Sequence, residues 1–345
     1  FLALLCAVVL VSALGVDPFL SFWASTDRIN GVLWWLHLGA LYLVLANILR
    51  TPQEWSRFFV VQVEIGLIVG LIFLLTQVDP TFLVASKGGA TTGNSTFLGA
   101  YLLFSVFFAL MLSARGHAVW MRRFGLFCAA VFAALVFATT AEAAKGALLG
   151  AVPTAAGLWL LIWDNGKRAR KWLGVGILAA LTAMFVYAVS TLFTAGSFFN
   201  NFFLSHTGGT RLEMWKIAWD AFLDRPLFGW GLENFPYAFW AHYSSCFGSP
   251  GCGGEYWFDR AHNKALDLLV EGGLVLLLTY VAVFGAAAWA FWLAYKAGQV
   301  SRAAVVVFFT FLIAYAVDNF LEFDVTVTVV VFVIGIAYAS APITT

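Results

Sequence analysis

His262 is the side chain in this sequence best suited to accept a proton. It follows the run Trp257-Phe-Asp-Arg-Ala and precedes Asn263, a residue type that commonly caps a helix. Asp267 favours the first turn of that helix because its charge opposes the positive end of the helix dipole. This positive end lowers the pKa of His262, so we expect a neutral imidazole that can act as a base. The alternative is that His262 is only a polar residue at a helix start.

Arg211 is placed where it could bind an anion. Thr210 and Glu213 have the spacing of a capping box, which predicts a helix that starts here and ends at Arg225-Pro226. The helix is amphipathic and is expected to lie at the membrane surface or on the bundle. Arg211 falls on its apolar face, together with Trp215, Ala218 and Phe222.

A guanidinium on an apolar face requires an anionic partner, because its burial without one is costly. That partner is either a bound ligand or a loop carboxylate, such as Glu233 or Glu255. Lys145 and Glu142 lie in the turn Thr139–Gly146, at the outer surface or just below it. Ionisable groups at this depth are candidates for a functional site. The alternative is an internal ion pair between them.

Further along, two glycines predict a tight turn and two cysteines predict a disulfide. Gly229 and Gly231 permit a tight turn with close backbone approach. Cys246 and Cys252 are predicted to form a small disulfide on the side of the membrane where disulfides persist. A metal site is disfavoured because their spacing fits no common zinc pattern and His242 is the only other soft ligand nearby.

These residues must be positioned by a membrane protein. The chain has 345 residues, of which 62% are hydrophobic and 11% charged, whereas soluble domains have roughly 45–50% apolar and about 25% charged residues. This composition excludes a soluble enzyme and a disordered protein. The net charge of +1 also excludes a nucleic-acid binder, because there is no basic excess to neutralise phosphates.

The expected fold is an all-α, polytopic membrane protein with about ten transmembrane helices. The spans are predicted at 1–16, 31–49, 58–76, 96–113, 124–141, 146–163, 172–192, 265–294, 303–317 and 325–341. Between the seventh and eighth spans, residues 193–264 form a connection too long to be a tether, so we expect the chemistry there. We therefore divide the chain into 1–192, 193–264 and 265–345.

The basic residues predict the orientation of the spans. Eleven of the 19 basic residues lie in the even-numbered connections: Arg50, Arg57, Arg115, Arg122, Arg123, Lys167, Arg168, Arg170, Lys171, Lys296 and Arg302. The positive-inside rule places these connections and both termini in the cytoplasm. The long connection, with Arg211 and His262, then lies outside.

The chain resembles the superfamily of O-antigen ligases and polymerases, which are bacterial envelope glycosyltransferases, over nearly its whole length. The resemblance rests on the order and spacing of Gly93-Asn94, Lys145-Gly146-Ala147, Arg211 with Trp215, 226–231 with Asn234-Phe235, His262-Asn263, Leu266 and Glu271-Gly272. It implies an architecture like that of polytopic, lipid-dependent glycosyltransferases, located in the bacterial inner membrane with its active site facing outward.

The implied reaction uses a glycan on undecaprenyl diphosphate as donor and a hydroxyl on lipid A-core, on another glycan or on a protein as acceptor. His262 would be the base of an inverting transfer, and Arg211, Lys145 and Arg260 would bind the diphosphate. Supporting roles are implied for Asn263, Asn94, Glu233 and Glu142. Neither a cofactor nor a metal ion is expected. Where the family usually has Arg, Lys145 keeps the charge but lacks the bidentate fork.

Ligase, polymerase and protein O-oligosaccharyltransferase share these motifs, and the sequence does not distinguish their acceptors. We favour the ligase. A flippase or transporter of lipid-linked sugars is the alternative from another class. It would have ionisable residues along several spans and internal repeats; only Glu64 fits this pattern.

Overall fold

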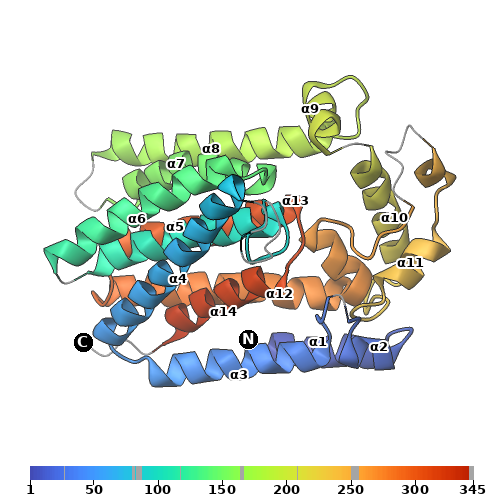
Figure 1. The fold of residues 1–345 in the computed structure, drawn as a ribbon, viewed down its shortest axis with the longest axis horizontal. Coiled ribbons are helices and arrows are strands. Elements are labelled where there is room, and N and C mark those ends of the chain that lie inside the picture. The colour runs from blue at the N-terminus through green and yellow to red at the C-terminus, as the bar shows by residue number, and fades with distance from the viewer. Residues whose placement is uncertain are drawn as a thin grey trace. The chain divides into compact units, whose positions relative to one another are not determined.

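The computed structural model describes residues 1–26, 28–79, 82, 88–116, 118–163, 167–207, 209–249 and 256–341. Within these ranges every regular element is a helix (Figure 1). The helices are α1 (Leu2–Ala13), α2 (Pro18–Trp23), α3 (Val32–Ile48), α4 (Pro52–Val78), α5 (Ser95–Arg115), α6 (Val119–Ala138), α7 (Glu142–Leu161), α8 (Arg168–Thr191), α9 (Phe198–Thr207), α10 (Thr210–Asp224), α11 (Phe235–Ala241), the 3-10 helix η2 (Ser245–Gly248), α12 (Lys264–Lys296), α13 (Arg302–Leu321) and α14 (Thr326–Ser340).

The predicted spans coincide with helices throughout. Among the described residues, seven helices are long and apolar enough to cross a membrane: α4, α5, α6, α7, α8, α12 and α13. The other three predicted spans correspond to the shorter apolar helices α1, α3 and α14. The structure therefore confirms the all-α, polytopic membrane fold.

Local signals explain where several helices begin. Thr51 and Glu54 form a capping box at the start of α4, with Pro52 in the first turn. Asn94 caps α5 by accepting a hydrogen bond from the Thr96 amide at 2.8 Å. Asn263 caps α12 in the same way, through the Leu266 amide at 3.1 Å, as the sequence predicted.

The capping box predicted for α10 is wrong. Gly209 precedes the helix and no side chain caps it. Glu213 instead pairs with Lys216 at 3.0 Å, one turn further along the helix. The helix itself starts at Thr210 and ends before Arg225, as predicted.

The chain forms two compact units, which are described separately. The first unit comprises Phe1–Gly39, Ala179–Val283 and Asn319–Phe323. Its core is an apolar cluster that includes Trp215 of α10, Phe235 and Phe239 of α11, and Phe258. This unit contains the whole long connection, 193–264, and the start of α12.

The second unit comprises Ala40–Leu178, Phe284–Asp318 and Asp324–Thr345. Its central helix is α5, which contacts α4, α6, α7 and α14. In the apolar stretch of α5, 78% of the residues are buried, whereas in that of α6 the share is 33%. Side chains such as Phe59, Phe104 and Tyr338 are almost completely buried around it.

Candidate functional site

The first unit contains a break in the spanning helix α12. Gly273 has φ 59° and ψ −160°, which no residue inside a regular helix adopts. A Cβ atom at this position would lie 2.4 Å from the carbonyl group of Leu227. Only glycine combines this left-handed backbone with such a close approach, so the break depends on Gly273.

The loop 226–231 replaces the hydrogen bonds that the break removes from α12. The replacement bonds join Leu274 N to Pro226 O at 2.8 Å, Val275 N to Leu227 O at 3.2 Å, Trp230 N to Val270 O at 2.8 Å, and Gly231 N to Glu271 O at 2.8 Å. Backbone groups at membrane depth need such partners, because no water is present to replace them. Gly229, with φ 64°, allows the loop to approach, since a Cβ there would lie 2.5 Å from the backbone of Glu271. The predicted tight turn is confirmed.

A buried ionic network lies beside this break. The guanidinium of Arg260 is paired with Glu233 and, at 2.9 Å, with Glu271. Although burial lowers it, the pKa of Arg260 is raised overall, because the carboxylates of Glu271 and Glu233 stabilise the charge. The Glu233 amide also donates to Glu271 at 2.9 Å, and the Ser25 hydroxyl donates to Glu233 at 2.9 Å. The network therefore joins the loop after α10, the segment before α12 and α12 itself.

His262 lies in the chain between Arg260 of this network and the first residue of α12. Its φ of 53° is in the left-handed region, which is uncommon outside glycine and costs of order 1–3 kcal/mol unless its surroundings impose it. The backbone is fixed on the preceding side, where the Ala261 amide donates to Asp267 at 2.7 Å. It is fixed on the following side by the Asn263 cap.

The environment of the ring keeps His262 neutral near pH 7. Burial lowers its pKa to about 4, and the positive charges of Arg211 and Arg28 act in the same direction. The sequence predicted the lowered pKa, but burial, rather than the helix end, is the largest cause. Nδ1 faces the Arg260 carbonyl at 3.3 Å. A proton on Nδ1 would donate to that carbonyl and leave Nε2 as the acceptor.

Arg211 is held by the last residue of α13 and by the residue that follows it. It donates to the Leu321 carbonyl at 2.7 Å and to the carboxylate of Glu322 at 3.0 Å. The predicted internal partner was Glu233, or Glu255, which lies outside the described residues. Glu233 instead pairs with Arg260. Burial raises the pKa of Glu322 although Arg211 lowers it.

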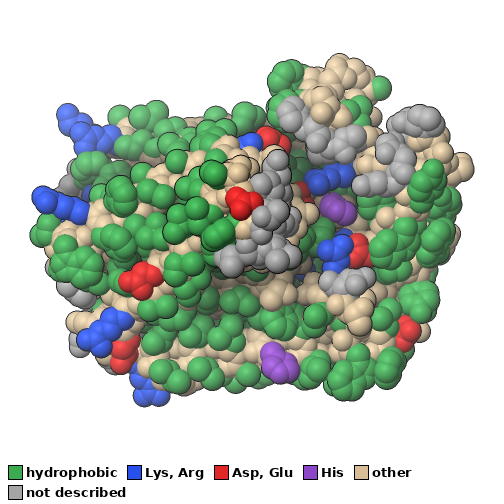
Figure 2. Space-filling view, in the orientation of Figure 1, with side chains coloured by type: hydrophobic (Ala, Val, Ile, Leu, Met, Phe, Trp, Pro, Cys, Tyr) green, Lys and Arg blue, Asp and Glu red, His purple; other side chains and the backbone are tan. Residues whose placement is uncertain are grey.

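Arg28 is a second cation near His262, and sequence reasoning missed it. It forms a bidentate pair with Asp259, with Nη2 to Oδ1 at 2.9 Å. Its guanidinium lies 4.8 Å from the ring centre of Phe323, and the ring of His262 also contacts Phe323, with the ring centres 4.9 Å apart and an interplanar angle of 89°. Figure 2 shows a histidine and basic side chains near one another on one face. Arg28 lies outside the even-numbered connections, where most of the basic residues are found. A basic residue in an odd-numbered connection is rare in this chain, and this rarity could have marked Arg28 as a site candidate.

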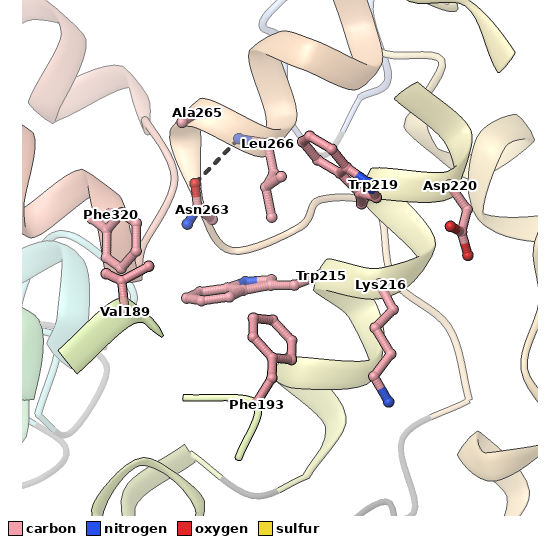
Figure 3. Close-up of a pocket in the computed structure, with 10 residues that line it drawn as sticks. All are labelled: Val189, Phe193, Trp215, Lys216, Trp219, Asp220, Asn263, Ala265, Leu266 and Phe320. Carbon is pink, nitrogen blue, oxygen red and sulfur yellow. Dashed lines mark hydrogen bonds between the residues drawn. The ribbon is translucent and has the colours of Figure 1, made fainter. Parts of the chain in front are cut away.

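A cavity of about 570 Å³ opens beside Asn263 and Trp215 (Figure 3). The indole of Trp215 donates to the Ala261 carbonyl at 2.9 Å, so one wall of the cavity is bonded to the residue before His262. The remaining wall is mostly apolar. The lining residues are Val189, Phe193, Trp215, Lys216, Trp219, Asp220, Asn263, Ala265, Leu266 and Phe320.

The other predicted site residues lie in the second unit or near the loop tip. Lys145 and Glu142 form an ion pair at 2.9 Å in the first turn of α7. Asn94 caps α5. Cys246 is disulfide-bonded, and Cys252, its predicted partner, lies outside the described residues. In the described part of the chain, no group of three or more His, Cys, Asp or Glu side chains could hold a metal ion.

Residues 127–281 match the O-antigen ligase family. The matched region runs from α6 into α12 and includes Lys145, Arg211, Arg260, His262 and the break at Gly273. It does not include Arg28 or Glu322. No curated protein matches the chain. The family match thus confirms the resemblance to the O-antigen ligase superfamily over residues 127–281.

Proposed function

Because residues 127–281 match the O-antigen ligase family, we propose that this membrane protein is a glycosyltransferase of the ligase type. It moves a glycan from undecaprenyl diphosphate to a hydroxyl of lipid A-core, on the outer side of the bacterial inner membrane. The observation that carries the proposal is the buried ring of His262, which packs on Phe323 beside the guanidinium of Arg28 and whose pKa is lowered by burial and by the charges of Arg211 and Arg28. Such a site combines a base with positive charge for an anionic leaving group.

In the proposed reaction, the acceptor oxygen attacks the anomeric carbon of the donor sugar. The bond from that carbon to the phosphate oxygen breaks as the new glycosidic bond forms, which inverts the configuration. The acceptor proton moves to Nε2 of His262, and undecaprenyl diphosphate leaves with the additional negative charge. A base that is neutral above about pH 4 is available at any physiological pH.

The guanidinium groups stabilise the leaving diphosphate. Arg211 uses two of its donors on Leu321 and Glu322, and a guanidinium has five, so others remain for phosphate oxygens. Arg28 likewise uses two of its donors, Nε and Nη2, on the carboxylate of Asp259. Its other donors could then contact phosphate oxygens.

Arg260 takes a different role from the one its charge suggested. It is 5% exposed and paired with two carboxylates, so its charge is already neutralised by the protein. We assign it as a positioning residue, which orients His262 through its own carbonyl and through the segment 260–263. Since guanidinium groups supply the positive charge, transfer is proposed to be metal-independent and to continue in the presence of a chelator.

The cavity beside Trp215 accommodates the lipid end of the donor in this proposal. Arg211 and Trp215 are one turn apart on α10, so a diphosphate at Arg211 brings its first isoprene units to the apolar wall of the cavity. This leaves the sugar end of the donor directed at His262.

The direct test is transfer by the purified chain with a lipid-diphosphate glycan and lipid A-core. We expect His262→Gln to lower kcat by about 10²–10⁴-fold, the usual contribution of a general base. His242→Gln is the matched control, because His242 lies in the same connection and pairs with Asp224 at 2.7 Å. Equal activity of the two variants would rule out His262 as the base.

The same assay separates the alternatives. Transfer in detergent, where there are no two sides of a membrane, cannot arise from flipping of a lipid-linked sugar. Products that grow by whole repeats without lipid A-core would identify a polymerase, and glycosylated protein would identify an O-oligosaccharyltransferase.

A further inference from the structure

The second unit contains a cavity of about 480 Å³ where three helices end or begin. It lies at the last turn of α5 and at the first turns of α6 and α13. The lining residues are Leu110, Ser113, Ala114, Arg115, Gly116, Arg122, Leu126, Ser301, Ala303 and Val307. Neither the proposed reaction nor the family match assigns a role to it.

The wall of this cavity changes from polar to apolar along each helix. In α5, Ser113 and Arg115 lie about one turn beyond Leu110. In α6, Leu126 lies one turn after Arg122. In α13, Val307 lies deeper than Ser301, whose hydroxyl caps the helix by accepting from the Ala304 amide at 3.2 Å. The cavity is therefore polar at the helix ends and apolar towards the middle of the helices.

The charge at the polar end is positive. None of the described lining residues is acidic. Arg115 is fixed in place, since it donates to the hydroxyl of the buried Tyr338 at 2.8 Å and lies 5.5 Å from the centre of that ring. Two of the three helices also start here, and helix starts favour anions.

The apolar end is open to lipid. Leu126 is 56% exposed and its neighbour Phe127 65% exposed, on a helix that is apolar enough to span a membrane. A hydrocarbon chain can therefore leave the cavity over Leu126 without meeting a polar group. A site with a cationic end and a lipid-facing apolar end fits an amphiphile with a phosphate headgroup.

We propose that this cavity binds an anionic phospholipid, with Arg115 and Arg122 contacting its phosphate and an acyl chain lying over Leu126. The positive-inside orientation puts this end of α5 in the cytoplasmic leaflet, where basic pockets between helices bind such headgroups. The bound lipid bridges α5, α6 and α13.

The test measures binding of phosphatidylglycerol to the purified full chain by native mass spectrometry. Arg122→Gln should raise the apparent Kd about five-fold, which corresponds to about 1 kcal/mol for one basic residue at a lipid headgroup. Arg123→Gln is the matched control: it removes the same charge from the next position of α6 but does not line the cavity. Arg122 is preferred to Arg115 because Arg115 also holds Tyr338.

Phosphatidylcholine and inorganic phosphate complete the experiment. We expect phosphatidylcholine to bind more weakly than phosphatidylglycerol, and inorganic phosphate not to displace the lipid at equal concentration. Equal weakening by Arg122→Gln and Arg123→Gln, or equal binding of the two lipids, would overturn the proposal. Displacement of the lipid by inorganic phosphate at equal concentration would also overturn it and identify a site for free phosphate.

Discussion

The charged neighbours of His262 come from several elements. Arg211 comes from α10, Arg28 from the connection between α2 and α3, and Asp259 from the segment before α12. Burial is the largest cause of the lowered pKa, and the two cations add to it. Only Asp259 and the Arg260 carbonyl act in the opposite direction. The same cations that would stabilise a diphosphate therefore also keep the base deprotonated.

The first prediction concerns pH. Because the pKa of His262 is lowered to about 4, the ring is neutral above this pH and becomes protonated as the pH falls through it. We expect kcat/KM for transfer to be independent of His262 ionisation between pH 5 and 8 and to fall below about pH 4. In Arg211→Gln, the loss of a positive charge should move this acid limb to higher pH, in whatever activity remains.

Lys216→Gln is the control for that shift, because Lys216 lies on the same helix but does not act on His262. Glu322 also has a raised pKa, so the profile is repeated in Glu322→Gln. An acid limb that disappears in Glu322→Gln would belong to Glu322 and would contradict the assignment to His262.

The second prediction concerns Arg28, which the family match does not cover. Arg28→Gln should lower kcat/KM about 10–100-fold, because one cation facing the leaving diphosphate contributes of order 1.5–3 kcal/mol. Arg28→Lys should recover only part of this loss, since Lys cannot form the bidentate pair with Asp259. The measurement is steady-state transfer with lipid-diphosphate glycan.

Arg225→Gln serves as its control, since Arg225 lies over the ring of Trp230 and outside the His262 environment. If Arg28→Gln and Arg225→Gln have equal kcat/KM, Arg28 has no part in the reaction.

The break in α12 turns one helix into two functional parts. The ten residues from Lys264 to Gly273 follow the Asn263 cap and carry Asp267 and Glu271, and these three side chains hold the segment of His262. The remainder of α12 has the composition of an ordinary span. Backbone hydrogen bonds join the loop 226–231 to α12 at the break, so the turn between α10 and α11 is tied to the helix that follows His262.

The third prediction follows from this assembly. Gly273→Ala should destabilise the protein, because a Cβ would lie 2.4 Å from the Leu227 carbonyl and a non-glycine residue at this φ costs about 1–3 kcal/mol. Gly285→Ala on the same helix meets nothing within 4 Å and should be neutral or slightly stabilising. Thermal unfolding in detergent measures both. A Tm for Gly273→Ala equal to that of Gly285→Ala would mean that the break is not required.

Much of this element-level organisation could be predicted from the sequence. Spans follow from long apolar runs, the Asn263 cap from residue type, and the close turn from Gly229. The break was not predicted, because a glycine inside an apolar run also fits an uninterrupted helix. The α10 cap was wrong because Gly209, and not Thr210, takes the N-cap position, and Glu213 pairs with Ser244 and Lys216 instead.

The site contacts that were missed are the long-range ones. Arg211 and Glu322 are 111 residues apart in sequence, and Arg28 and Asp259 are 231 apart. Residue types showed that Arg211 needed an anion, but periodicity and spacing carry no information about which distant carboxylate the fold supplies. The same limit explains why Arg260, an outer cation by sequence, proved to be neutralised by Glu233 and Glu271.

At the scale of the whole chain, the distribution of the basic residues predicts the orientation of the protein in the membrane. Eleven of its 19 basic residues fall in the even-numbered connections, which the positive-inside rule assigns to the cytoplasm. The proposed donor and acceptor meet on the opposite side. Orientation is therefore a condition of the proposed reaction, and it can be measured without any substrate.

The fourth prediction tests that orientation with single reporter cysteines. Cys6 and Cys128, the free cysteines among the described residues, are first replaced by Ala. Trp257→Cys, at a side chain that is 51% exposed in the long connection, should react with an impermeant maleimide in intact spheroplasts. Lys167→Cys, in a basic connection, should react only after the membrane is permeabilised. The opposite pattern would place His262 in the cytoplasm, away from an outer-face acceptor. The proposed transfer would then fail even if His262 proved to be a base.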